Sequence, residues 1–192
     1  MESTRSNNKG FSSKGALVPS MVWRLLVSGA MALVFLVVDQ VSKMIVRRAV
    51  MTGFFSVEVI PGVLGLEFVA NRGAAFGLGE GMGWVFVLLA VGVTAFVLVY
   101  LLRAPKISRL EVLGMGMVVG GAIGNAIDRL VFGFVTDFFA TRFIDFPVFN
   151  VADIGITCGV AIAFIGFMFF SPAAREHIDN NLQAGAEDGS DR

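Results

Sequence analysis

The sequence predicts an all-α membrane protein with four transmembrane helices and a small extracytoplasmic β-hairpin or sheet. Hydrophobic residues make up 56% of the 192 residues and charged residues only 16%, and the mean hydropathy is +0.78. Soluble domains usually have about a quarter charged residues, so lipid must solvate much of this chain. The apolar residues gather in four long segments, and another stretch alternates around a turn dipeptide.

The four apolar segments have the length of membrane spans. They cover residues 23–46, 81–102, 112–127 and 154–171. A hydrocarbon core of about 30 Å needs roughly 17–25 helical residues. The second segment carries no charge, whereas the first has Asp39 and Lys43 near its end, the third is followed by Asp128 and Arg129, and the fourth follows Asp153. These polar ends must lie at the interface or inside the bundle.

The third segment also has a pattern of small residues. Gly116, Gly120 and Gly124 are each four residues apart. Glycines at this spacing share one face of a helix and let a neighbouring helix approach closely. We therefore expect a packing face there.

The stretch between the first two spans predicts a hairpin. Residues 56–60 and 65–69 alternate apolar and other residues on either side of Pro61 and Gly62. Alternation around such a dipeptide is typical of two short strands joined by a turn. The sequence therefore predicts a small sheet on the membrane surface.

The membrane domain is expected to cover residues 21–172. Residues 1–20 are rich in Ser, Asn, Gly and Lys and read as a disordered cytoplasmic tail, and residues 173–192 as a polar cytoplasmic tail. A cleaved signal peptide over residues 1–38 is not expected, because the apolar run passes directly into Asp39 without a small-residue cleavage site.

Basic residues predict the orientation. The N-terminal tail carries Arg5, Lys9, Lys14 and Arg24, and the short loop between the second and third spans carries Arg103, Lys106 and Arg109. The positive-inside rule makes both regions cytoplasmic. Four spans then leave both termini in the cytoplasm.

Several kinds of site are excluded by composition. Cys158 is the single cysteine, and His177, the single histidine, lies in the C-terminal tail. Zinc proteases, Ser-His-Asp hydrolases and Cys-His proteases all need an imidazole beside the reacting group. We therefore expect no metal and no cofactor. The formal net charge of zero gives no sign of a nucleic-acid partner.

The topology brings many polar residues to the outer ends of the spans: Asp39, Asn71, Arg72, Asn125, Asp128, Arg129, Asp137, Asn150 and Asp153. Such residues at membrane depth usually mark function or a compensating pair.

For several of these residues the sequence favours a structural role. We expect Asp128 to pair with Arg129 and Asp39 to brace the first helix. We expect Lys43, Arg47 and Arg48 to contact lipid headgroups. Asn125 with Asp128, and Asn150 with Asp153, are three apart and would share a helix face, where the amide can orient the carboxylate.

Asp137 has a different setting, because its neighbours Phe134, Val135, Phe138 and Phe139 are apolar. Desolvation there would raise its pKa. A second carboxylate nearby would push the two pKa values apart, which is how aspartic proteases keep one acid protonated and the other ionised. The residues alone leave Asp39, Asp128, Asp137 and Asp153 all open as members of such a pair.

Five motifs in order resemble the bacterial lipoprotein signal peptidases (signal peptidase II). They are Asp39-Gln40-Val41-Ser42-Lys43, Asn71-Arg72-Gly73-Ala74-Ala75-Phe76-Gly77, the run from Gly120 to Arg129, Val135-Thr136-Asp137-Phe138, and Phe149-Asn150-Val151-Ala152-Asp153. The resemblance covers roughly residues 22–171.

The resemblance implies both fold and activity. Members have four helices and a small extracytoplasmic sheet. They act at the outer face of the cytoplasmic (inner) membrane of bacteria, where they cut a prolipoprotein before its diacylglyceryl cysteine, and globomycin inhibits them.

The resemblance also assigns roles to residues, and the catalytic pair corresponds to Asp137 and Asp153. Supporting residues correspond to Asn71, Asn125, Arg129 and Asn150, and residues of structural role to Asp39, Lys43 and Asp128. Gly73 and Gly77 would allow close backbone approach. Arg72 departs from the small polar residue of many relatives.

Other classes remain as alternatives. A transporter or channel subunit would use the acids as an ion relay, but then polar residues should run through the midplane of several spans. A scaffold held by the glycine face leaves the carboxylates unexplained. A Ser42 and Lys43 dyad is disfavoured, since adjacent helical residues point about 100° apart.

Overall fold

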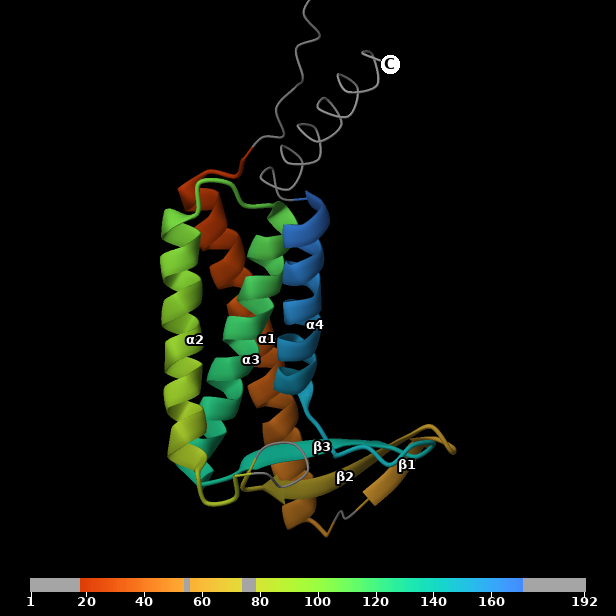
Figure 1. Ribbon diagram of the computed structural model, residues 1–192. Helices are drawn as coiled ribbons and strands as arrows, with labels where there is room; N and C mark the ends of the chain where they lie inside the picture. The colour runs from red at the N-terminus through yellow and green to blue at the C-terminus, as the bar shows by residue number, and fades with distance from the viewer. Residues whose placement is uncertain (1–17, 54–55, 74–78, 171–192) are drawn as a thin grey trace, which may run out of the picture.

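The computed structural model describes residues 18–53, 56–73 and 79–170 (Figure 1). Its helices are α1 (Met21–Met51), α2 (Gly83–Arg103), α3 (Arg109–Phe132) and α4 (Val151–Ile165), which continues into a π-helical turn, η2 (Gly166–Phe170). Within the described ranges, four helices are long and apolar enough to cross a membrane, the last extending to Phe170. The predicted four-helix membrane fold is confirmed. Apart from residues 18–20, the predicted tails lie outside the described residues.

Helix α3 is the centre of the bundle, because it packs against each of the other three helices. The predicted glycine face is confirmed and lies against α1. A Cβ at Gly116 would collide with the carbonyl of Ser28, and a Cβ at Gly120 with that of Ala32. Backbones can approach this closely only where side chains are absent.

A second glycine face on α3, which the sequence analysis missed, lies against α4. Gly114 packs against the carbonyl of Gly159, and Gly121 against that of Ala152. The contact between Gly121 and Ala152 holds the first turn of α4 against the middle of α3, and the contact between Gly114 and Gly159 joins the two helices further toward the other end of the bundle. Two faces of one helix are thus packed backbone to backbone, which fixes the polar groups that each carries.

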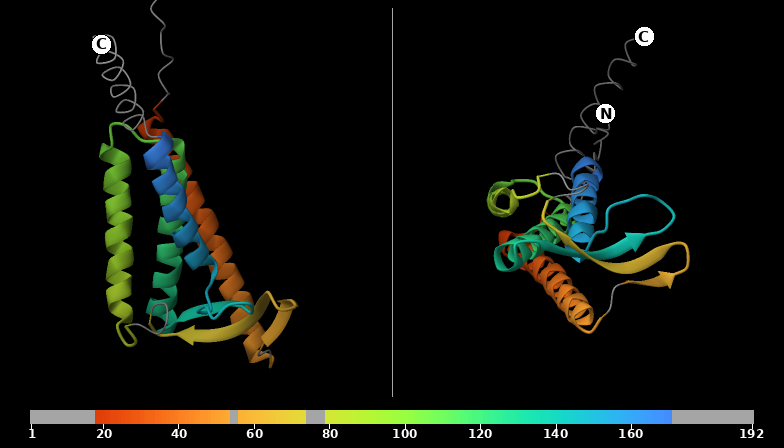
Figure 2. Two further views of the ribbon diagram at one scale, coloured as in Figure 1. Left: turned by 45° about the vertical axis from the view of Figure 1, so that its right-hand side comes forward. Right: turned by 90° about the horizontal axis from the view of Figure 1, so that it is seen from below.

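The sheet consists of β1 (Ser56–Ile60), β2 (Leu64–Asn71) and β3 (Val135–Thr141), antiparallel and in that order. It lies across one end of the bundle and extends past the helices (Figure 2). The predicted hairpin is confirmed as β1 and β2. Strand β3 was not predicted as a strand; it pairs with β2 so that Val69 faces Asp137.

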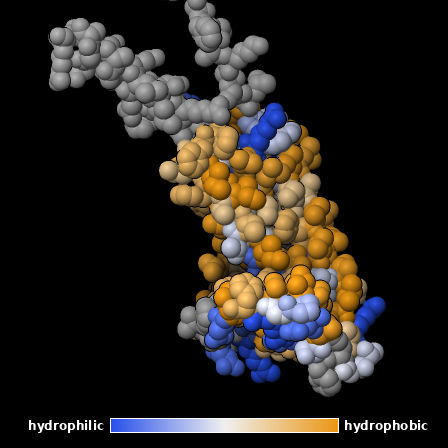
Figure 3. Space-filling model, turned by 90° about the vertical axis from the view of Figure 1, so that its right-hand side faces the viewer, coloured by the Kyte–Doolittle hydropathy of each residue, from blue (hydrophilic) through white to orange (hydrophobic). Residues whose placement is uncertain are grey.

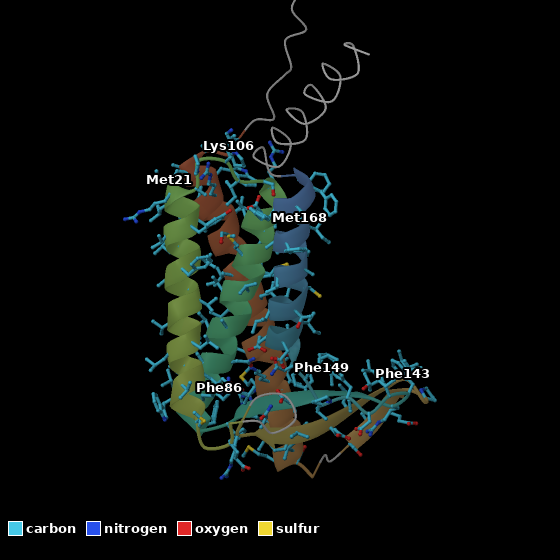
Figure 4. All side chains as sticks on the ribbon, in the orientation of Figure 1. Met21, Phe86, Lys106, Phe143, Phe149 and Met168 are labelled. Carbon is cyan, nitrogen blue, oxygen red and sulfur yellow. The ribbon has the colours of Figure 1, made fainter. Side chains whose placement is uncertain are left out.

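The two ends of the bundle differ in character. On the face seen in Figure 3, the helices present a largely apolar surface, and hydrophilic side chains gather at the sheet end. Met21 and Lys106 lie together at the opposite end, and Phe86 and Phe149 lie near the sheet (Figure 4). The start of α1 and the loop between α2 and α3 therefore share one side of the membrane.

Candidate active site

A cavity of about 450 Å³ lies between β3, the start of α4 and the outer part of α3. Two carboxylates, Asp137 and Asp153, face it. Its other polar walls are Asn71, Asn125, Arg129 and Thr157, and the remainder is mostly apolar: Val135, Phe146, Pro147, Val148, Phe149, Ile154, Ile156 and Cys158. The two acids that the family resemblance pairs therefore meet in one hollow.

Asp137 is buried in the middle of β3 and is held by two amides. Asn71 at the end of β2 donates to its Oδ2 at 2.9 Å, and Asn150 donates to its Oδ1 at 2.6 Å. Burial raises the pKa of Asp137 to about 6, and the charge of Asp153 adds to this, while the two amide hydrogen bonds and Lys43 oppose it. The pKa of Asp137 is therefore raised, in the direction that its apolar sequence neighbours predict.

Asp153 lies in the first turn of α4, within a capping box. Asn150 is the N-cap residue: its side-chain oxygen accepts from the Asp153 N–H at 3.0 Å, and its own N–H donates to Asp153 Oδ2 at 3.1 Å. Asn125 donates to Asp153 Oδ1 at 2.8 Å. The expectation that Asn150 and Asp153 share a helix face was wrong, because Asn150 precedes the helix and caps it.

Asn150 joins the two acids. Its amide nitrogen donates to Asp137 while its amide oxygen and its main chain hold Asp153. A carboxyl whose pKa is raised by burial and a carboxyl at a helix N-terminus, where negative charge is favoured, thus line the same cavity. This arrangement can supply one acid and one base.

Behind the cavity lies a fully buried charged cluster formed by Asp39, Lys43 and Asp128. Lys43 Nζ lies 2.9 Å from Asp39 and 3.5 Å from Asp128. Asp39 also accepts from the backbone N–H of Ala152 at 2.9 Å, so it braces α4 as well as α1. The expectation that Lys43 contacts headgroups was wrong, since its neighbours in the bundle are carboxylates.

The two arginines near the end of α1, Arg47 and Arg48, have different surroundings. Arg47 lies 3.4 Å from Asp128 and donates to Thr136 Oγ1 at 2.9 Å, so the headgroup expectation fails for it too, whereas Arg48 is exposed. The alternative Ser42 and Lys43 dyad is not formed, because the Ser42 hydroxyl donates to the Asp39 carbonyl at 2.8 Å.

Arg129 is directed away from Asp128, and the predicted ion pair between them was wrong. Adjacent residues on a helix diverge by about 100°. Asp128 instead accepts from the Thr136 N–H at 2.9 Å, which fixes the start of β3 behind α3. Arg129 donates to the carbonyl of Gly73 at 2.8 Å, lies over the ring of Phe86 and borders the cavity.

The segment after β2 is partly described. The Gly73 N–H donates to Asn71 Oδ1 at 2.9 Å. Arg72 is exposed and lines a neighbouring cavity with Glu80 and Trp84. Gly77, expected to allow close approach, lies outside the described residues.

The aromatic wall was not predicted as part of the site. Phe149 pairs with Phe139 of β3 by an isolated antiparallel bridge, and their rings lie 5.6 Å apart. The signal for Phe149 is its place in the Phe149-Asn150-Val151-Ala152-Asp153 motif. Over the described ranges 18–53, 56–73 and 79–170, no three His, Cys, Asp or Glu side chains are grouped so as to hold a metal ion.

Comparison with known proteins agrees with this picture. A family model, "Signal peptidase (SPase) II", matches residues 31–169. The lipoprotein signal peptidase of Symbiobacterium thermophilum is 42% identical over 142 residues, covering 73% of this chain and 93% of that protein. The lipoprotein signal peptidase of Geobacillus thermodenitrificans is 39% identical over 154 residues, covering 79% and 92%.

Two solved structures, both described as bacterial membrane enzymes determined by the in meso method, are also similar. The one at 2.3 Å resolution has a TM-score of 0.68 and 30% identity, covering 75% of this chain and 88% of that chain. The one at 1.9 Å resolution has a TM-score of 0.66 and 29% identity, covering 76% and 95%. Sequence, fold and family model agree, and the chain belongs to the signal peptidase II family.

Proposed function

We propose that this chain is an aspartic endopeptidase of the bacterial cytoplasmic membrane. It removes the signal peptide from prolipoproteins that bear a diacylglyceryl cysteine and cuts before that cysteine. The observation that carries the proposal is the meeting of Asp137 and Asp153 at one cavity, linked by the Asn150 side chain and main chain. Relatives that cover most of the chain are named lipoprotein signal peptidases.

The two carboxyls take different roles in the proposed reaction. Asp153, at the N-terminus of α4 where negative charge is favoured, removes a proton from water as the water oxygen attacks the scissile carbonyl carbon. Asp137, which holds its proton to higher pH because burial raises its pKa to about 6, hydrogen-bonds in its protonated form to the carbonyl oxygen as negative charge develops there. The proton held by Asp153 then passes to the leaving nitrogen, and the C–N bond breaks.

Substrate reaches the cavity from the bilayer in this proposal. Ile154, Thr157 and Cys158 line the cavity from α4, and Ile154 and Cys158 are exposed on the helix. Taking an acyl chain out of lipid costs about 0.8 kcal/mol for each CH₂, so a lipidated substrate stays in the membrane while it binds. Globomycin-type inhibitors would occupy the same cavity, and no nucleic acid is involved.

The end of β2 supports the peptide near the cleavage point. Asn71 holds Asp137, and Arg129 holds the Gly73 carbonyl at 2.8 Å, so the turn after β2 is tied to both the strand and α3. Gly73 is buried and has no side chain to block a peptide backbone. We propose that this turn and the sheet clamp the substrate over the two acids.

The test is cleavage of a lipidated prolipoprotein peptide in detergent by equal amounts of folded protein. Asp137→Asn and Asp153→Asn are close in size to wild type and cannot exchange a proton near neutral pH. Each should lose at least about 10²–10⁴-fold in kcat, and the double variant should be little worse, because the pair acts as one unit. A chelator should leave the wild-type rate unchanged.

Asp128→Asn is the matched control, since Asp128 is buried at the same end of the bundle but binds Thr136 and basic side chains. It should lose activity mainly through a smaller folded fraction. Substantial cleavage by Asp137→Asn or Asp153→Asn would remove that residue from the mechanism and reopen the case for Asp128.

A further inference from the structure

Three asparagines hold the two carboxylates, and each has its own amide oxygen occupied by a group that can only donate. The carboxylates receive amide N–H groups from Asn71, Asn125 and Asn150. The three oxygens accept from Gly73 N at 2.9 Å, Lys43 Nζ at 2.8 Å and Asp153 N at 3.0 Å, respectively. Backbone N–H groups and ammonium groups carry no acceptor, so each amide can turn only its NH₂ toward an acid.

The orientation of these amides decides whether they stabilise or repel a carboxylate. An amide rotated by 180° would present its oxygen to the acid, which replaces a hydrogen bond with repulsion between two acceptors. For Asn71 and Asn150 the orienting donor is main chain and comes with the fold. For Asn125 the orienting donors are side chains: the ammonium of Lys43, on a different helix, at 2.8 Å, and the amide nitrogen of Asn150 at the longer distance of 3.2 Å.

We infer that Lys43 is a positioning residue for the proposed cleavage: its ammonium fixes the amide of Asn125, and through that amide the hydrogen bond received by Asp153. This inference rests on the proposed function and deepens it. Lys43 itself does not border the cavity and is fully buried, so it acts through Asn125.

The surroundings of Lys43 leave its ammonium little freedom. Its three N–H groups face three acceptors, namely Asn125 Oδ1 at 2.8 Å, Asp39 Oδ2 at 2.9 Å and Asp128 Oδ2 at 3.5 Å. The two carboxylates hold the ammonium in place. The cluster of Asp39, Lys43 and Asp128 thus supports the site by fixing the orientation of the Asn125 amide.

Other charged groups also act on Asp153 and must be kept constant in a test. They are Arg129 on α3 and Asp137 on β3. Asp39 on α1 also binds the N–H of Ala152, the residue before Asp153. Removing Lys43 alone would leave Asp39 and Asp128 buried with less compensation, which endangers folding.

The variant that isolates the positioning role is therefore Lys43→Met combined with Asp39→Asn. It removes one positive and one negative charge, and the new Asn can still accept from Ala152. Asp128 keeps Arg47 and the Thr136 N–H. Asp39→Asn alone and Arg47→Met are the matched controls, because each alters the same charged cluster without touching an asparagine of the site.

Cleavage of the lipidated peptide is measured from pH 4 to 8, per amount of folded protein. We expect the double variant to lose about tenfold or more in kcat with KM within about twofold, as for loss of a hydrogen bond to a charged group. The acidic limb of the profile should move to higher pH, because a carboxylate that loses a hydrogen-bond donor holds its proton more tightly. Both controls should keep the wild-type limb.

A folded double variant with the wild-type kcat and acidic limb would overturn the inference. Asn125→Asp serves if the double variant does not fold: it still accepts from Lys43 but offers Asp153 no N–H, so the limb must again move up, and an unmoved limb also overturns the inference. Failure of the wild type to cleave the peptide would instead count against the proposed function.

Discussion

The buried carboxyl of Asp137 makes the stability of the fold depend on pH. Burial raises its pKa to about 6 from the ordinary value of 3.8. The folded protein therefore binds this proton more tightly than the unfolded chain does. The resulting stabilisation is full below about pH 4 and is lost as the pH rises through about 6. Above that pH the fold must hold a charged group that burial disfavours.

Asp137→Asn removes the buried carboxylate that becomes charged, so the variant should gain stability relative to wild type as the pH is raised from 4 to 7. The change over that range should be about 2–3 kcal/mol in the free energy of unfolding, given 1.36 kcal/mol for each pKa unit. Thermal unfolding in detergent at several pH values measures it. Asp145→Asn, at an exposed carboxylate of the following loop, is the control and should show no such trend. Parallel curves for wild type and Asp137→Asn would contradict the prediction.

At the residue scale, the sequence predicted which carboxylates lie at the site but not which side chains they contact. Asp137 stood out because its neighbours are apolar, and the family motif paired it with Asp153. The ion pair expected between Asp128 and Arg129 failed, because proximity in sequence says nothing of direction around a helix. Lys43 was expected at headgroups because its contact with Asn125 joins residues 82 apart in the chain.

At the scale of elements, the contact between α1 and α3 depends on the absence of side chains. A methyl group at Gly120 would meet the carbonyl of Ala32, and backbone cannot yield as a flexible side chain can. Gly120→Ala should therefore cost about 1–3 kcal/mol of stability, as overpacking does, with activity lost in proportion to folded protein. Thermal unfolding in detergent provides the measurement.

Gly92→Ala is the matched control, because a Cβ there would meet nothing within 4 Å. It should leave the unfolding temperature unchanged or slightly raised, since alanine favours helix more than glycine does. If Gly120→Ala were equally harmless, the two helices would be packed less closely than described.

The helices were predictable because each is a long apolar run with its own signal. Strand β3 was not, although its sequence, VTDFFAT, is rich in β-branched and aromatic residues. A single strand has no local signature of its partner: β3 pairs with β2, so that Asn71 reaches Asp137 across 66 residues of sequence. The second glycine face was missed for a similar reason, since its partner lies on α4.

For the whole molecule, the two ends of the bundle predict its orientation in the membrane. Met21 and Lys106 lie at one end of the bundle and the sheet at the other (Figure 4). The helix bounds place Arg24, Arg103 and Arg109 at the same end as Met21 and Lys106. We expect the basic end in the cytoplasm and the sheet and cavity outside. A topology reporter fused after residue 60 should read as exported and one fused after residue 106 as cytoplasmic. Export of the reporter after residue 106 would reverse the assignment.

The charged cluster behind the cavity has a consequence for how the chain is made. Helix α1 carries Asp39 and Lys43, but Asn125, which completes the coordination of Lys43, follows 82 residues later. At about 5–20 residues per second, α1 must wait several seconds for it. Asp39 and Lys43 are four residues apart and 2.9 Å from each other, so they can neutralise each other within α1 during that interval. The same pair that later supports the cavity thus lets a newly synthesised helix enter lipid before its neighbours exist.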